Sequence, residues 1–289
     1  MYVAIRDDVL RLAEYPSIAE GLKDLQLDSV EVEFCHDYSV WDTAGWNKIS
    51  FTPADAAKAI KNAYGKRKIK ICAFLLHNNF NCPEPQKEVQ WVVDVIKTAE
   101  ELKIPAIRID AITKGEKEEP FEVRVTRFVD CMRKALEATS ASKVVLGIEN
   151  HGIQGNDPAF LKQVIERVGN ERLGVTMDTG NFYWNGFPLG EIYDILRSVS
   201  PSTKHTHVKN IRYPEETRQQ KRENGWEYGK YVSPIYEGDI DHKQVVAILK
   251  NAGYNGPLTI EDECLGKLDA GQKKEVLRKD AAYLKGLLD

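Results

Sequence analysis

Eight apolar segments of strand length recur along this chain of 289 residues, and amphipathic segments separate them. Strands that alternate with helices form a parallel sheet with right-handed crossovers. Eight such units in about 260 residues therefore predict an α/β fold, a closed (β/α)8 TIM barrel, in preference to an open doubly wound sheet. In one intervening segment the apolar residues have helical spacing: Val89, Val92, Val93, Ile96, Ala99 and Leu102. The strands are expected around residues 2–5, 29–34, 69–77, 106–111, 144–150, 173–179, 204–209 and 257–261.

The length and composition suit one core. Hydrophobic residues make up 42% of the chain, and barrels of about 250 residues commonly form one domain, so we predict a single domain over residues 1–289. Residues 211–240 interrupt the alternation of strands and helices, because they are polar and charged and lack helical spacing. We predict that they form an inserted loop after the seventh strand, at the active site or at a subunit interface. The loop contains basic and aromatic residues that suit either role: Arg218, Arg222, Trp226, Tyr228, Tyr231 and Tyr236.

A residue that can bind a metal ends each of the last four predicted strands. These residues are Glu149, Asp178, His207 and Glu261. Glu149 and Asp178 are 29 residues apart, as are Asp178 and His207, which is about one strand and one helix. The inserted loop accounts for the longer step of 54 residues to Glu261. Because the carboxyl ends of barrel strands meet at one rim, we expect the four side chains to converge on the barrel axis.

Three carboxylates and one imidazole form an oxygen-rich set that suits one divalent ion. Mn²⁺ is the ion that we predict first, with Mg²⁺ and Co²⁺ as alternatives. Such an ion can hold the carbonyl and a neighbouring hydroxyl of a keto sugar and stabilise an enediolate when a carbon-bound proton leaves. Glu149 and Glu261 reach the substrate from opposite walls, so we predict that both act as catalytic acid and base as well as ligands.

Other strand-end residues are candidates for the same pocket. His151 lies two residues after Glu149 and could be a further catalytic acid or base. Lys209 could stabilise an oxyanion, and Arg212 could bind a carboxylate or sugar hydroxyls. His77 ends the third predicted strand and could contact the substrate. For each of them, a hydrogen-bonded or solvated structural role is the alternative.

The segments IENHG, MDTGN, HTHVKN, EGDID and GYNGPLTIED resemble the xylose-isomerase-like TIM-barrel superfamily, particularly its sugar (phosphate) isomerase/epimerase branch. The resemblance is specific over residues 144–263. It implies that Glu149, Asp178, His207 and Glu261 bind the divalent ion and that the two glutamates transfer protons. Epimerases of this kind commonly have His three residues after the strand-six Asp, where this chain has Asn181. Asn cannot titrate, so a substrate-binding or supporting role is expected there.

We therefore predict a metal-dependent sugar isomerase or epimerase of carbohydrate metabolism. A lyase of the same superfamily, similar to inosose dehydratase or to enzymes that cleave 3-keto glycosides by β-elimination, would use the same first step and is the alternative. An apurinic-site endonuclease is a remote alternative, because six histidines and a formal charge of −4 disfavour a His-rich multinuclear site and a basic surface. A non-catalytic sugar-binding subunit is a further reading, against which the complete ligand set argues.

The expected partner is a small sugar, with or without a phosphate, and not nucleic acid. Asp7 and Asp8 interrupt the apolar stretch that a signal peptide would need, and no later run approaches 18 apolar residues, so no membrane association is expected. Five scattered cysteines without CxxC spacing suit reduced thiols and a cytoplasmic location. A homo- or hetero-oligomer formed through the inserted loop is compatible with the sequence.

Overall fold

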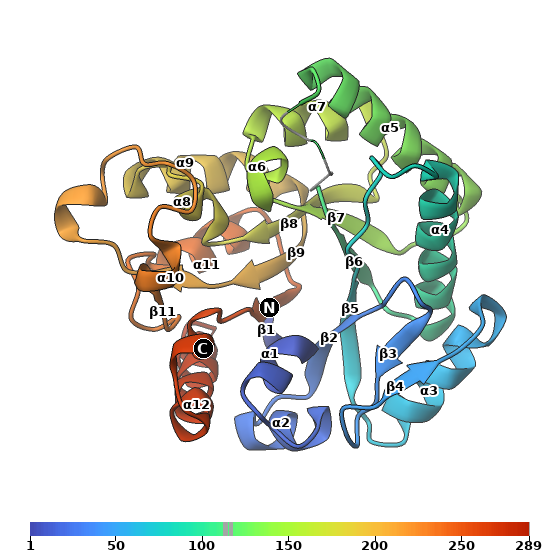
Figure 1. The fold of residues 1–289 in the computed structure, drawn as a ribbon, viewed down its shortest axis with the longest axis horizontal. Helices are drawn as coiled ribbons and strands as arrows, with labels where there is room; N and C mark the ends of the chain where they lie inside the picture. Colours follow the sequence, from blue (N-terminus) through green and yellow to red (C-terminus); the bar gives the residue numbers. More distant parts are fainter. Residues whose placement is uncertain (112–114, 116–117, 289) are drawn as a thin grey trace.

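Eight parallel strands form a closed barrel in the computed structural model, which describes residues 1–111, 115 and 118–288 (Figure 1). The predicted (β/α)8 TIM barrel is confirmed. Its last strand pairs with its first, with Tyr2 opposite Pro257 and Ile5 opposite Ile260. The barrel strands are β1 (Tyr2–Arg6), β2 (Ser29–Glu33), β5 (Lys70–Leu75), β6 (Ala106–Ile109), β7 (Val145–Glu149), β8 (Leu173–Asp178), β9 (Thr203–Val208) and β12 (Pro257–Ile260).

Amphipathic helices surround the barrel, as their sequence pattern predicts. In α4 the predicted apolar face is buried against the strands from Val89 to Ala99. Helix starts carry the expected signals: Asp157 accepts from the backbone N–H of Ala159 ahead of Pro158, and Asp269 and Gln272 form a capping box. The covering helices are α2 (Ile18–Leu25), α3 (Ala56–Gly65), α4 (Pro85–Leu102), α5 (Phe121–Ala138), α7 (Pro158–Val168), α9 (Leu189–Val199), α11 (His242–Asn251) and α12 (Ala270–Gly286).

Short elements occupy the loops. A hairpin of β3 (Ser39–Trp41) and β4 (Lys48–Ser50) follows β2, and the single turns α6 (Gly152–Gly155) and α8 (Asn181–Trp184) follow β7 and β8. Helix α1 (Asp7–Leu12) follows β1 directly. Among the described residues, none of the helices combines the length and the apolar character that crossing a membrane requires.

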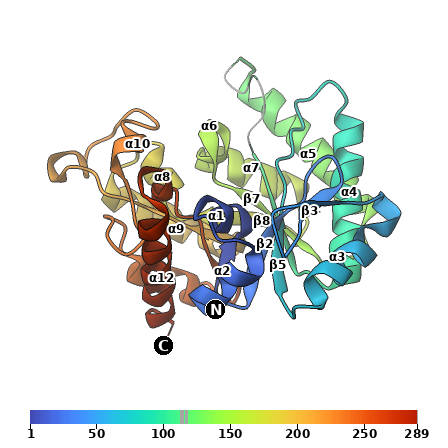
Figure 2. The same ribbon diagram turned by 60° about the horizontal axis from the view of Figure 1, so that its bottom comes forward.

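The inserted segment after β9 is more ordered than its polar sequence predicts. It includes an antiparallel pair, β10 (Asn210–Ile211) with β11 (Val232–Ser233), and the helical turn α10 (Tyr228–Tyr231). Tyr213 and Ile235 are buried within it. In Figure 2 this orange segment lies beside α8, at the end of the barrel away from the two termini. The insertion therefore packs on its own barrel at the rim where the strands end.

Candidate metal and active site

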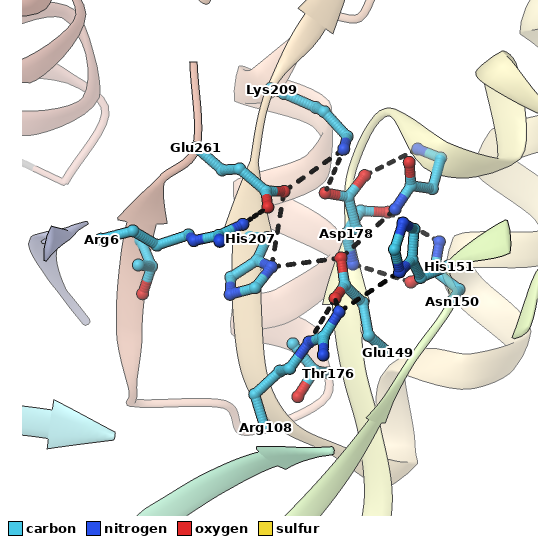
Figure 3. Close-up of polar contacts among 12 residues, drawn as sticks. Arg6, Arg108, Glu149, Asn150, His151, Thr176, Asp178, His207, Lys209 and Glu261 are labelled. Atoms are coloured by element: carbon cyan, nitrogen blue, oxygen red, sulfur yellow. Dashed lines mark hydrogen bonds and ion pairs between the residues drawn. The ribbon is translucent and has the colours of Figure 1, made fainter. Parts of the chain in front are cut away.

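The four strand-end residues lie together inside the barrel rim. Glu149, Asp178, His207 and Glu261 are at most 4% exposed, and each offers one ligand atom within 4.8 Å of those of the others (Figure 3). Nδ1 of His207 lies 3.2 Å from Oε1 of Glu149 and 3.4 Å from Oε2 of Glu261. Strand register brings them together, since Asp178 on β8 pairs directly with His207 on β9.

The charge of this cluster fits a bound cation. Three carboxylates share a buried space, and two oxygens, Oδ2 of Asp178 and Oε2 of Glu261, accept no hydrogen bond from the described residues, although the ammonium of Lys209 lies 3.4 and 3.3 Å from them. Unpartnered carboxylate oxygens are costly in a protein interior unless a cation or a donor compensates them. The donor set of three oxygens and one imidazole nitrogen therefore suits a divalent ion such as Mn²⁺, Mg²⁺ or Zn²⁺.

Burial and the neighbouring charges shift the pKa values of these groups in opposite directions. Burial raises the pKa of Asp178, although the ammonium of Lys209 opposes the rise. Burial also penalises the charged form of Glu149, but the guanidinium of Arg108 and the imidazole of His207 outweigh it and hold the pKa of Glu149 well below its ordinary value. For His207, burial is outweighed by Glu31 and Glu149, which raise its pKa to about 9. A metal ion must displace a proton from this imidazole, so binding would release a proton.

Two arginines that are not among the predicted site residues pair with carboxylates of the ligand candidates. Arg6, at the end of β1, forms an ion pair with Oε1 of Glu261. Arg108, on β6, pairs with Oε2 of Glu149 and also donates to the backbone oxygen of Leu76 over 2.7 Å. Each arginine lies within an apolar strand, YVAIR and AIRI, and a buried charge in such a strand is the signal that could have identified it.

Lys209 and Asn181 also lie in the cluster. Nζ of Lys209 is 3.4 Å from Oδ2 of Asp178, 3.3 Å from Oε2 of Glu261 and 2.9 Å from Oε1 of Glu263. The lysine passes over Gly180, where an added Cβ would lie 2.7 Å from its Cγ. Asn181 is buried, and its side-chain amide donates to Oε1 of Glu149 over 3.3 Å. Both residues therefore contact the ligand candidates, and their contact with substrate stays a prediction.

An open cavity of about 720 Å³ adjoins the cluster. His151 and His77 line it, together with Arg6, Arg108 and Glu261. Nδ1 of His151 lies 3.4 Å from Oδ1 of Asp110, and Nδ1 of His77 lies 3.8 Å from Oδ2 of the same carboxylate. The lining also includes Arg11 and Leu12 of α1, Glu14 after it, and Lys273 of α12.

Arg212 is placed differently from the other predicted residues. Its side chain is exposed, it does not line this cavity, and its backbone N–H donates to Tyr231 over 2.9 Å. Strand β10 explains the position, because Ile211 and Tyr213 on either side of it are buried, which turns Arg212 outward. The structure therefore does not bring Arg212 to the ligand cluster, and its contact with substrate stays a prediction.

A sequence model of the family described as the xylose isomerase-like TIM barrel matches residues 20–287. The chain belongs to this family. The resemblance predicted from the strand-end motifs is thus confirmed. A relative, an uncharacterized protein of Methanocaldococcus jannaschii, is 27% identical over 140 residues, which are 47% of this chain and 42% of the relative. The alignment thus spans less than half of either protein.

Solved structures of the xylose isomerase-like barrel cover nearly the whole chain. A D-tagatose 3-epimerase-like protein has 19% identity, a TM-score of 0.65 and full coverage of both chains. Mannonate dehydratase from Streptococcus suis has 11% identity and a TM-score of 0.70, covering 99% of this chain and 92% of its own. The IolI protein with a bound zinc atom has 14% identity and a TM-score of 0.69, covering 98% and 97%. At these identities the likeness shows the fold alone.

Proposed function

We propose that this protein is a divalent-metal-dependent sugar isomerase or epimerase that removes a proton next to the carbonyl of a keto sugar. The observation that carries the proposal is the buried cluster of Glu149, Asp178, His207 and Glu261, with two carboxylate oxygens that accept no hydrogen bond from the described residues. Epimerases are among the solved neighbours, which supports a related chemistry. The compartment that we propose is the cytoplasm, since the five cysteines are unpaired thiols.

The four clustered residues would hold the ion, with Mn²⁺ as our first choice. Bound there, it would polarise the carbonyl of the substrate and stabilise the negative charge of an enediolate. Glu149 and Glu261 come from β7 and β12, so their carboxylates approach the rim from separate walls. One can remove the proton and the other can return it to the opposite face or to the neighbouring carbon. Arg6 and Arg108 hold these carboxylates in orientation.

The test is hydrogen exchange. We would incubate Mn²⁺-loaded protein in D₂O with ketohexoses, inososes and 3-keto glycosides and follow the products by NMR. Deuterium next to the carbonyl of a rearranged sugar would support the proposal. Loss of that exchange in Glu149→Gln, but not in a control with the same charge change at the exposed Glu166, would assign it to this site. No exchange with any compound while metal is bound would contradict the proposal.

A metal-dependent lyase is the second candidate, and the shape of the cavity favours it. The cavity extends from Glu261 and His151 to Leu12 and Lys273, which leaves room for a group attached to the sugar. His151 is about one-third exposed in that cavity and could give a proton to a departing hydroxyl or alkoxide. Release of an aglycone or of water in the same NMR experiment would identify elimination. Mannonate dehydratase among the neighbours supports this candidate.

An apurinic-site endonuclease is less well supported. Among the described residues, only two groups of His, Cys, Asp or Glu lie close enough to hold an ion, and both include His207. A His-rich multinuclear centre would need further independent ligands. The formal charge of −4 also gives little attraction for DNA.

A further inference from the structure

Glu31 lies deep in the barrel, beneath the ligand cluster, and faces two imidazoles. It comes from β2, is 1% exposed, and its two oxygens point to two histidines of β9. Oε2 lies 2.8 Å from Nε2 of His207, and Oε1 lies 2.9 Å from Nε2 of His205. The first contact is a hydrogen bond between residues 176 positions apart. A buried carboxylate thus crosses the barrel interior to reach the imidazole of a ligand candidate.

This contact determines which nitrogen of His207 is left free to bind an ion. An ionised carboxylate can only accept hydrogen bonds, so the hydrogen must lie on Nε2 of His207. Nδ1 faces Glu149 and Glu261, whose oxygens lie 3.2 and 3.4 Å away, so Nδ1 is the nitrogen left for an ion, which would displace the hydrogen there. We propose that Glu31 is a positioning residue that fixes the orientation and tautomer of His207 for metal binding through Nδ1. The inference rests on the proposed function, because it assumes that His207 is a ligand.

The surroundings of Glu31 hold it in this place. With one oxygen at each imidazole, its carboxylate cannot rotate without losing a contact. Nε of Arg6 lies 4.0 Å from Oε2, and Arg6 also pairs with Glu261, so the same arginine links Glu31 to a second ligand candidate. Carboxylates that orient a ligating histidine typically change metal affinity by about 10- to 100-fold when they are removed.

The same three residues could instead bind an ion of their own, since Glu31, His205 and His207 offer ligand atoms within 4.8 Å of one another. The geometry favours the positioning role. A second ion there would require Nε2 of His207, which is already at hydrogen-bonding distance from Glu31, and would make one imidazole bridge two ions. The two alternatives differ in stoichiometry, which is one ion per chain for positioning and two for a second site.

The experiment is a calorimetric titration of metal-free protein with Mn²⁺, comparing wild type with Glu31→Asp, Glu31→Gln and Glu33→Gln. Glu31→Asp keeps the charge but withdraws the carboxylate by one methylene, so it separates position from charge. Glu33 lies on the same strand, and its carboxylate lies 3.9 Å from Nε2 of His77 rather than beside His207, so Glu33→Gln is the control. Thermal unfolding of the metal-free variants verifies folding, and Glu31→Asp serves if Glu31→Gln does not fold.

We expect one Mn²⁺ per chain in every variant, with affinity weakened about 10- to 100-fold in both Glu31 variants and within about threefold of wild type in Glu33→Gln. The visible spectrum of Co²⁺-loaded Glu31→Asp should also differ from that of wild type, because the imidazole is no longer held. Wild-type affinity in Glu31→Asp, or a fall from two ions to one, would overturn the proposal. Failure of the wild-type protein to bind any metal would instead refute the proposed function.

Discussion

Asn181 connects two of the ligand candidates: its side-chain amide donates to Oε1 of Glu149 over 3.3 Å, and its backbone N–H donates to Oδ1 of Asp178 over 2.7 Å. It is the first residue of α8, so the start of this short helix is tied to the ends of β7 and β8. The resemblance to epimerases leads one to expect a histidine here. In this chain the asparagine supports the carboxylates of the cluster.

Asn181→Ala should weaken metal binding about tenfold and lower kcat/KM about tenfold, because Oε1 of Glu149 loses one of the donors that orient it. Asn185→Ala, at the other end of the same helical turn, is the control, since Asn185 donates to the backbone oxygen of Asn156 instead. Calorimetry with Mn²⁺ and steady-state kinetics would measure both effects. Equal behaviour of the two variants would show that Asn181 does not orient Glu149.

Glu149→Gln and Glu261→Gln should each reduce turnover by about 10²- to 10⁴-fold, the range associated with a lost acid or base. Because both residues are also predicted ligands, the bound metal must be measured in the same samples. A variant that keeps its metal and loses solvent exchange has lost proton transfer alone. Near-normal activity in either variant would refute its assignment as a proton carrier.

Removal of the metal should destabilise the folded protein. An ion that binds the folded state only, at 100 times its dissociation constant, adds about 2.7 kcal/mol to the free energy of unfolding, or roughly 5–8 °C in Tm. Chelation followed by differential scanning calorimetry, with and without Mn²⁺, would measure the change. Asp178→Asn should abolish this response, whereas Asp194→Asn on the exposed side of α9 should keep it. A Tm independent of Mn²⁺ would argue against the site.

His242 should make stability depend on pH. It is fully buried at the start of α11, 3.3 Å from Oγ1 of Thr179, and burial lowers its pKa to about 4. The unfolded chain takes up this proton near pH 6.5 and the folded chain only near pH 4. Stability therefore falls as the pH drops through this window, by up to about 3 kcal/mol, and the effect is absent above it. The free energy of unfolding, measured with urea from pH 4 to 7.5, should depend less on pH in His242→Gln than in wild type. An equal pH dependence in the two proteins would contradict the assignment.

Tyr228 links the insertion to the site, since its hydroxyl donates to Glu263, which in turn contacts Lys209. Tyr228→Phe should lower kcat/KM by about fivefold, equivalent to ~1 kcal/mol for a partly exposed hydrogen bond. Tyr236→Phe, at a tyrosine close to Glu237 in the same insertion, should have no effect. If neither change alters the kinetics, but changes in the insertion alter the oligomer mass measured by analytical ultracentrifugation, the insertion is a subunit interface instead.

The strand-end ligand candidates could be found from sequence because strand rhythm places them at one rim without any knowledge of packing. The residues that contact these candidates could not be found from the sequence. Arg6 and Glu31 meet the cluster only because the barrel closes, which brings β1 and β2 to the same interior as β12 and β9, whereas Arg108 reaches Glu149 from β6, the strand that pairs with β7. Arg212 illustrates a further limit, since the β10–β11 pairing turns its side chain outward and no periodicity in the polar segment revealed that pairing.

Arg222 gives the insertion its attachment. Its guanidinium donates to the backbone oxygens of Tyr183 and Phe187 and lies over the rings of Tyr183 and Tyr213. Tyr183 belongs to α8, the helical turn that begins at Asn181, so the insertion is bonded to the same turn that supports Glu149. A loop grafted from a relative onto this barrel would therefore also have to supply a cation at this position, or the backbone oxygens of Tyr183 and Phe187 would lose the guanidinium as a donor.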